Sequence, residues 1–201
     1  MSSHPPLILG SSSKYRAHLL TAASIPFTIL TFPIDEKNNI PGRTATSTPS
    51  ETALAVARAK AAALLANRAE DVRNALVVTC DQVVSCGGET REKPKDEAEC
   101  RRYLKGYESQ PAETHSAVVV TNTSTGAVAE GVDVARQHFL PLPAHIIDAL
   151  IAKRDVMYCA GGFMIDDPIM FPYLGAREGD EDSIIGMPLV LLKRLIEQVS
   201  N

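Results

Sequence analysis

Three consecutive serines followed by two basic residues form the first candidate site, within residues 7–20 (LILGSSSKYRAHLL). The apolar run at 7–10 predicts a buried strand, and the serines stand where a helix starting near Lys14 needs hydroxyl caps. The start of a helix attracts anions, whereas the cations of Lys14 and Arg16 are disfavoured there unless an anion binds. The segment therefore indicates either a phosphate site or an ordinary capped helix. Neither a P-loop nor a dinucleotide-binding pattern is present.

A second candidate is an acidic residue at the end of another predicted strand. Residues 75–79 (ALVVT) predict a buried strand, which leads directly into Cys80, Asp81 and Gln82. Open α/β sheets place their sites at the carboxyl ends of strands, where a carboxylate can bind Mg²⁺ or accept a proton from an attacking water. The alternative is an aspartate that only caps a helix or shapes a turn.

The elements that must position these residues alternate between strands and helices. Thr48, Pro49 and Glu51 form a capping box with proline at the first helical position. Helices are predicted at 14–23, 48–69, 96–105, 142–154 and 187–199, and further strands at 25–32 and 169–174, with an antiparallel hairpin at 114–121 and 127–139. This alternation predicts a mixed α/β fold, and 201 residues can bury the core of a single domain over 1–201.

Composition restricts the class of partner. The net charge of −4 argues against nucleic acid or an anionic membrane surface as a partner. No apolar run approaches the length of about 20 residues that a membrane span needs, and residues 1–6 are too short for a signal peptide. The four cysteines lack CxxC spacing and are expected to be reduced thiols of an intracellular protein. A polyanion would therefore need a local basic pocket, with a metal ion.

The segment 7–20 resembles the opening motif, strand–SxSPxR–helix, of the Maf family of nucleoside triphosphate pyrophosphatases. The stretches CDQVV at 80–84, EKPKDEAEC at 92–100 and YCAGGF at 158–163 resemble further motifs of that family in the same order. The resemblance implies one Maf-like domain over 1–201, with two lobes about a cleft as in inosine triphosphate pyrophosphatases. It also implies cleavage between the α- and β-phosphates, a divalent metal cofactor (Mg²⁺, or Mn²⁺ or Co²⁺), a homodimer and a cytoplasmic location.

The same resemblance suggests roles for individual residues. Asp81 matches the proton acceptor, and Glu36 matches an acidic residue that could be a second metal ligand beside Asp81. His115 matches a histidine of the central strand, which is either reactive or buried and hydrogen-bonded. The residues that would hold the triphosphate are Ser11, Ser13, Arg16, Lys60 and Lys93, and Lys60 and Lys93 would assist catalysis with Asp81.

Three positions bear on which base is bound. SKYR, CDQV and CAGGFMID resemble the 7-methyl-GTP pyrophosphatase branch (SPWR, SDQV, CAGSFKSEG) more than the branch acting on dTTP and UTP (SPRR, ADT, AGAYGIQG). A 7-methylguanine ring is cationic, so Tyr15 could stack on it, while Asp166 could accept hydrogen bonds from its N1–H and amino group. Gln82 would select the base through a further hydrogen bond.

Four departures from the branch pattern leave alternatives open. Lys14 replaces Pro, Tyr15 replaces Trp, Glu92 replaces the Gly before Lys-Pro, and Asp166 is shorter than the Glu it replaces. Glu92 adds negative charge near the expected phosphates. The alternatives are therefore a dTTP or UTP pyrophosphatase, and a catalytically weak nucleotide-binding regulator of cell division.

Overall fold

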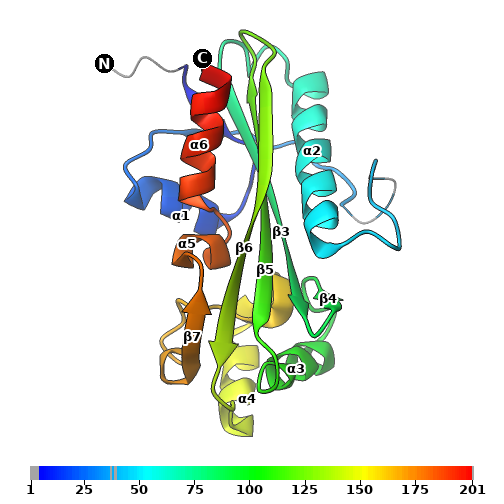
Figure 1. Ribbon diagram of the computed structural model, residues 1–201, viewed down its shortest axis with the longest axis vertical. Helices are drawn as coiled ribbons and strands as arrows, with labels where there is room; N and C mark the ends of the chain where they lie inside the picture. Colours follow the sequence, from blue (N-terminus) through cyan, green and yellow to red (C-terminus); the bar gives the residue numbers. More distant parts are fainter. Residues whose placement is uncertain (1–4, 37, 39, 201) are drawn as a thin grey trace.

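The centre of the molecule is a mixed sheet flanked by helices (Figure 1), seen in a computed structural model that describes residues 5–36, 38 and 40–200. Within that part of the chain the strand order is β2-β1-β3-β5-β6-β7, and β4 pairs with β3. The strands are β1 (Leu7–Leu9), β2 (Thr28–Ile29), β3 (Leu76–Cys86), β4 (Glu89–Arg91), β5 (Ala112–Asn122), β6 (Val128–Phe139) and β7 (Leu174–Glu178). β1 pairs in parallel with β2 and β3, whereas the other pairs are antiparallel, so the predicted mixed α/β fold is confirmed.

Two helices cover opposite faces of the long strands (Figure 1). Because side chains alternate along a strand, Val119 on β5 packs with α2 (Pro49–Asn67), while its neighbours Val118 and Val120 pack with α6 (Leu189–Ser200). The same alternation on β3 sends Cys80 toward α6 and Val83 toward α2. The sheet thus carries a separate apolar layer on each face.

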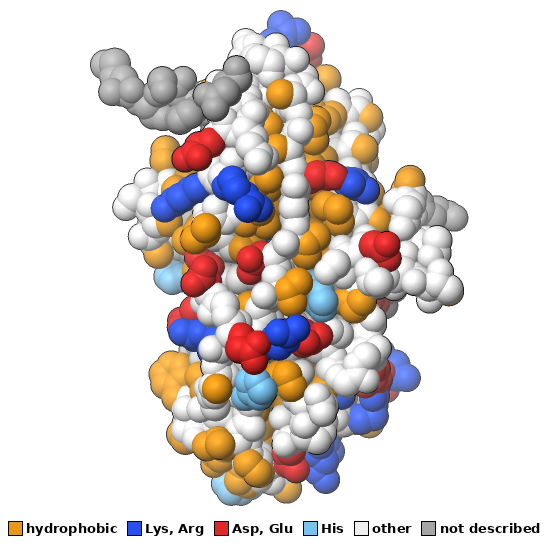
Figure 2. Space-filling view, viewed as in Figure 1, with side chains coloured by type: hydrophobic (Ala, Val, Ile, Leu, Met, Phe, Trp, Pro, Cys, Tyr) orange, Lys and Arg blue, Asp and Glu red, His pale blue; other side chains and the backbone are white. Residues whose placement is uncertain are grey.

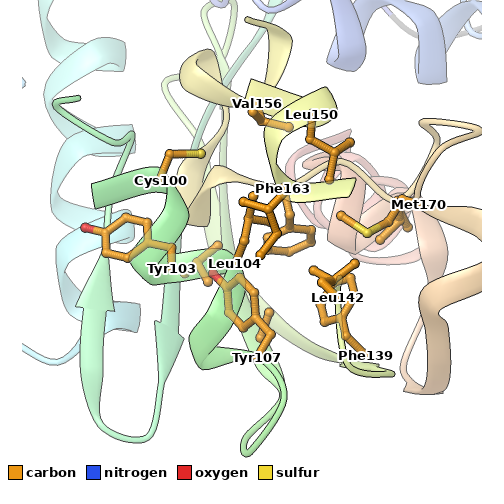
Figure 3. Close-up of a cluster of buried hydrophobic side chains, with 14 of the residues drawn as sticks. Cys100, Tyr103, Leu104, Tyr107, Phe139, Leu142, Leu150, Val156, Phe163 and Met170 are labelled. Carbon is orange, nitrogen blue, oxygen red and sulfur yellow. The ribbon is translucent and has the colours of Figure 1, made fainter. Parts of the chain in front are cut away.

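The far ends of β3, β5 and β6 enter a second large apolar cluster (Figure 3). It is closed by α3 (Glu97–Gly106) and α4 (Ala144–Lys153). The rings of Tyr107, Phe139 and Phe163 pack with centroids 5.3 to 5.4 Å apart. The long strands therefore connect the two helix-covered apolar layers to this cluster.

Local capping signals agree with the structure. The Ser13 hydroxyl caps α1 (Lys14–Ala22) by accepting from the N–H of Arg16, and Thr48 and Glu51 form the predicted capping box of α2. Asp96 caps α3 through the N–H of Glu99.

None of the helices described is long and apolar enough to cross a membrane.

Three predicted strands differ from the structure. The strand predicted at 75–79 continues to Cys86, so Asp81 lies in the middle of β3 and not at its end. Of residues 25–32 only Thr28–Ile29 pair, because their partner β1 has just three residues. The strand predicted at 169–174 is wrong: Phe171–Tyr173 form the 3₁₀ helix η3, since a proline at 172 cannot donate to a sheet ladder, and β7 begins at Leu174. The remaining short helices are η1 (Asp155–Tyr158), η2 (Ala160–Gly162) and α5 (Glu181–Ile185).

Candidate active site

The site begins as a gap in the sheet beside β3. One edge of β3 pairs continuously with β5, but its other edge pairs with β1 only as far as Val78 and with β4 only from Val84. Residues 79–83 therefore have no strand partner on that edge within the described chain. The carbonyl of Cys80 accepts from Arg16 Nη1 at 3.0 Å and from Lys60 Nζ at 3.5 Å, so cationic side chains replace the missing strand.

A cavity of about 870 Å³ opens at this gap, which is within the usual range for small-molecule sites. All of the site residues predicted from the sequence line it: Ser11, Ser13, Tyr15, Arg16, Glu36, Lys60, Asp81, Gln82, Lys93 and Asp166. They come from α1, α2, β3 and the loops between elements. The fold thus brings residues that are far apart in the sequence, from Ser11 to Asp166, to the wall of one cavity.

The serine turn forms one wall of the cavity. Gly10 is required here because a Cβ would lie 2.6 Å from Leu64 and from Thr79, while its N–H bonds the Val78 carbonyl at 2.7 Å. The Ser11 hydroxyl accepts from the Ser13 N–H at 3.2 Å and from Arg16 Nη1 at 3.1 Å. The turn therefore holds a guanidinium beside the start of α1 at the cavity, an arrangement suited to an anion.

Lys60 lies between two carboxylates at the centre of the cavity. Its Nζ is 2.8 Å from Asp81 Oδ1 and 2.9 Å from Glu36 Oε1. Burial raises the pKa of Asp81 above the ordinary aspartate value, although Lys60 and Arg16 act in the opposite direction. Burial also acts to raise the pKa of Glu36, but Lys60, Lys93 and Arg16 make the net shift downward. The two acidic groups thus differ in proton affinity.

The chemistry of these donors fits a divalent cation in part. Two carboxylate oxygens already face one cationic group, and hard cations such as Mg²⁺ take carboxylate oxygens together with water and phosphate oxygens. The described residues contain no group of three or more His, Cys, Asp or Glu side chains that could hold a metal by themselves. A metal at this position would therefore complete its coordination with water or phosphate oxygens.

The cavity lining also includes an aromatic and an amide side chain, those of Tyr15 and Gln82. The Tyr15 hydroxyl donates to Met164 Sδ at 3.5 Å, and burial, with Cys159 and Asp155 nearby, raises the pKa of Tyr15, so the phenol stays neutral. The Gln82 amide nitrogen donates to Ser116 Oγ at 2.9 Å and to the carbonyls of residues 183 and 184 at 3.0 Å. Because the amide N–H groups of Gln82 already donate to protein acceptors, the group that remains for a ligand is the side-chain carbonyl oxygen.

His115 does not line the cavity. Its Nδ1 lies 2.8 Å from Ser50 Oγ and its Nε2 lies 3.0 Å from Ser85 Oγ. Burial lowers the pKa of His115, which favours the neutral ring. Of the two interpretations left open by the sequence, these contacts favour the buried, hydrogen-bonded histidine.

Further lining residues were not predicted as part of the site. They include Arg43, Lys95 and Tyr158, and the cavity is also lined by Glu92 and by Lys14, to which the sequence assigns no contact with the substrate. Arg43 Nη2 lies 2.6 Å from Glu92 Oε1, so the charge of Glu92 has a partner. No local pattern marks Arg43, because it lies in a loop and its partner is 49 residues away. Among the described residues that line the cavity, six are basic and four acidic.

The surface away from the cavity is mixed in charge. On the face shown in Figure 2, basic and acidic side chains lie interspersed. Arg136 forms ion pairs with both Glu113 and Glu178. The excess of basic over acidic groups in the cavity therefore stands out against this mixed face and against a net charge of −4.

Comparison with known proteins gives consistent matches over the full chain. The family model described as Maf-like protein matches residues 6–199. The 7-methyl-GTP pyrophosphatase of Dictyostelium discoideum is 41% identical over 199 residues, covering 97% of this chain and 98% of that protein. A protein of the same name from Methylobacillus flagellatus is 32% identical, covering 98% and 96% of the two chains. The solved HAM1 protein of Coxiella burnetii covers 98% of both chains at 12% identity with a TM-score of 0.39, which is too low to support a conclusion.

Proposed function

This chain belongs to the Maf-like protein family, and we propose that it is a nucleoside triphosphate pyrophosphatase that acts on 7-methyl-GTP. The observation that carries the proposal is the cavity in which Lys60 lies between Asp81 and Glu36. Relatives named for the same activity match over nearly their whole length. The reaction is hydrolysis of the α–β phosphoanhydride, giving the nucleoside monophosphate and pyrophosphate.

Binding of the triphosphate rests on fixed positive charge. Arg16 is held by the carbonyls of Gly186 at 2.9 Å and Cys80 at 3.0 Å, so its guanidinium is oriented before a ligand arrives. Lys93 lines the cavity and forms no ion pair with the carboxylates of the described residues, which leaves its ammonium for phosphate oxygens. Ser11 and Ser13, beside the start of α1, would contribute hydroxyl and N–H contacts.

Asp81 is placed to accept the proton of the attacking water. Its Oδ1 is bonded to Lys60, and none of the described residues donates to Oδ2, which therefore remains for water or a cation. The raised pKa brings this carboxylate closer to neutral pH and makes it a stronger base than an exposed aspartate. The water oxygen bonds to one phosphorus of the α–β bridge, the bond to the bridging oxygen breaks with its electron pair, and the proton passes to Asp81.

Glu36 and Asp81 would hold the divalent cation. When bound, Mg²⁺ (or Mn²⁺ or Co²⁺) supplies neutralisation of the charge on the phosphate oxygens. Lys60 already places one positive charge between these carboxylates, and this contact supports their proposed role as ligands of a cation. Displacement of Lys60 toward the phosphates would let both cations act on the same anion.

The base would be recognised by Tyr15, Gln82 and Asp166, which all line the cavity. An aromatic face attracts the cationic 7-methylguanine ring, and an exposed carboxylate at Asp166 can accept from its N1–H and amino group. The carbonyl oxygen of Gln82 adds a further acceptor.

The family resemblance also leads us to propose a homodimer in the cytoplasm. Light scattering on the purified protein would test the dimer, and cell fractionation would test the location.

The deciding experiment is pyrophosphate release with Mg²⁺ from 7-methyl-GTP, GTP, dTTP, UTP and CTP in parallel. We expect 7-methyl-GTP to be the best substrate by at least about tenfold, the factor that one cation–π contact can provide. A preference for dTTP or UTP would overturn the base assignment but not the hydrolysis. Tight binding without turnover, in Mn²⁺ or Co²⁺ as well, would indicate a binding-only protein.

A further inference from the structure

Glu92 places a negative charge in a cavity that has to bind a polyanion. It lines the cavity directly before Lys93, and its side chain is 37% exposed. An uncompensated carboxylate there would repel phosphate oxygens and weaken the effect of Lys93. The chain must therefore either bind triphosphate poorly or compensate this charge.

Arg43 provides the compensation from a different loop. Its Nη2 lies 2.6 Å from Glu92 Oε1, and its side chain is only 22% exposed. Its other terminal nitrogen, Nη1, donates to the carbonyl of Glu36 at 2.6 Å. The backbone of the loop that carries Glu36 thus fixes the guanidinium in an orientation that directs Nη2 toward Glu92.

The Glu92 backbone is also fixed. Its carbonyl accepts from the N–H of Gly161 at 3.1 Å, within the 3₁₀ segment that follows Cys159. Both ends of the Arg43–Glu92 pair are therefore attached to backbone that borders the cavity. Because the guanidinium is already held by the Glu36 carbonyl, the pair loses less side-chain entropy than a free surface pair and is more effective.

We propose that Arg43 is a positioning residue for triphosphate binding, which acts by cancelling the charge of Glu92 beside Lys93. The inference rests on the proposed function, because it concerns the affinity of the same cavity for a triphosphate. Arg43 does not contact the phosphates in this scheme. Removal of Glu92 should therefore make Arg43 unnecessary.

The test is a double-mutant cycle of Arg43→Gln, Glu92→Gln and the double variant, with Arg58→Gln as matched control. Arg58 also pairs with a glutamate, Glu130, but neither residue lines the cavity. Affinity is measured by calorimetry with the α,β-methylene analogue of 7-methyl-GTP, which needs no turnover. KM, kcat and the melting temperature are measured beside it.

We expect Arg43→Gln to raise Kd and KM about tenfold with little change in kcat, and the double variant to return within about threefold of wild type. Arg58→Gln should leave Kd unchanged. A double variant as weak as Arg43→Gln would overturn the inference, because Arg43 would then act on the ligand directly or through folding. A wild-type protein that binds the analogue but never hydrolyses a triphosphate would refute the proposed function alone, and the Kd values would still decide the role of Arg43. Absence of binding by the wild type would overturn both.

Discussion

The ammonium group of Lys60 lies 2.8 Å from Oδ1 of Asp81, and both side chains are largely buried, at 16% and 14% exposure. The same ammonium contacts Glu36, so one positive charge faces two negative ones. Inside a protein, such an imbalance is strongly felt because the local dielectric constant is low. The protonation states of Lys60, Asp81 and Glu36 are therefore coupled, and this coupling determines how the neighbouring residues should respond to substitution.

Asp81→Asn should abolish pyrophosphate release while leaving the fold intact. The amide has nearly the same shape but cannot accept a proton from water, and general-base catalysis typically contributes about 10²- to 10⁴-fold in rate. The melting temperature should not fall, because the change removes a buried charge whose pKa burial already raises. Steady-state assays with 7-methyl-GTP and a thermal melt check both points. An Asn variant within tenfold of the wild-type rate would remove Asp81 from the role of proton acceptor.

The acidic limb of the pH–rate profile should move when Lys60 is changed. Asp81 acts as a base only when ionised, so the rate rises with pH through the pKa of Asp81, which burial places above the ordinary value. Lys60 lowers that pKa, and Lys60→Gln should therefore shift the limb to higher pH as well as reduce kcat. Profiles of kcat against pH for the two proteins provide the measurement. A limb that stays in place or moves to lower pH would contradict the coupling of Lys60 to the base.

Removal of divalent metal should stop the reaction, and Glu36→Gln should raise the metal requirement. EDTA should abolish turnover, and Mg²⁺ should restore it. Loss of one of two carboxylate ligands should increase the half-saturating Mg²⁺ concentration about tenfold, because each ligand charge contributes to affinity. Direct binding of Mn²⁺, followed by electron paramagnetic resonance, separates this effect from catalysis. An unchanged requirement would exclude Glu36 as a ligand.

The sequence predicts those parts of the fold that depend on neighbouring residues. Ser13 and Thr48 cap their helices as expected, because a hydroxyl needs only an N–H two or three residues away. The strand at 75–79 is predicted too short because Asp81 and Gln82 interrupt its apolar run, while β5 offers a partner along almost all of β3. Pairing between distant strands thus overrides the local pattern at that point.

The residues that line the candidate site can be predicted from motif resemblance, but their contacts with one another cannot. The resemblance points to Asp81 and Lys60 separately, but no spacing in the sequence indicates that Lys60 also contacts Glu36. The sequence places the negative charge of Glu92 near the expected phosphates. It does not indicate that Arg43 is the partner of Glu92, because their pairing depends on how two loops meet. Compensating charges of this kind are properties of the folded chain.

Tyr15 should determine the preference for the methylated base. Its ring lies at the cavity, its hydroxyl is held by Met164 Sδ at 3.5 Å, and the Lys14 ammonium already lies 5.2 Å from the ring centroid. The ring face can therefore accept a cation. Tyr15→Phe keeps that face and should retain the ratio of kcat/KM for 7-methyl-GTP over GTP within about threefold. Tyr15→Leu keeps apolar bulk without a π-face and should lower the ratio by about five- to thirtyfold, corresponding to the loss of about 1 to 2 kcal/mol. Competition assays with both nucleotides in one reaction measure the ratio directly, and equal ratios for the Phe and Leu variants would show that stacking on Tyr15 is not what selects the base.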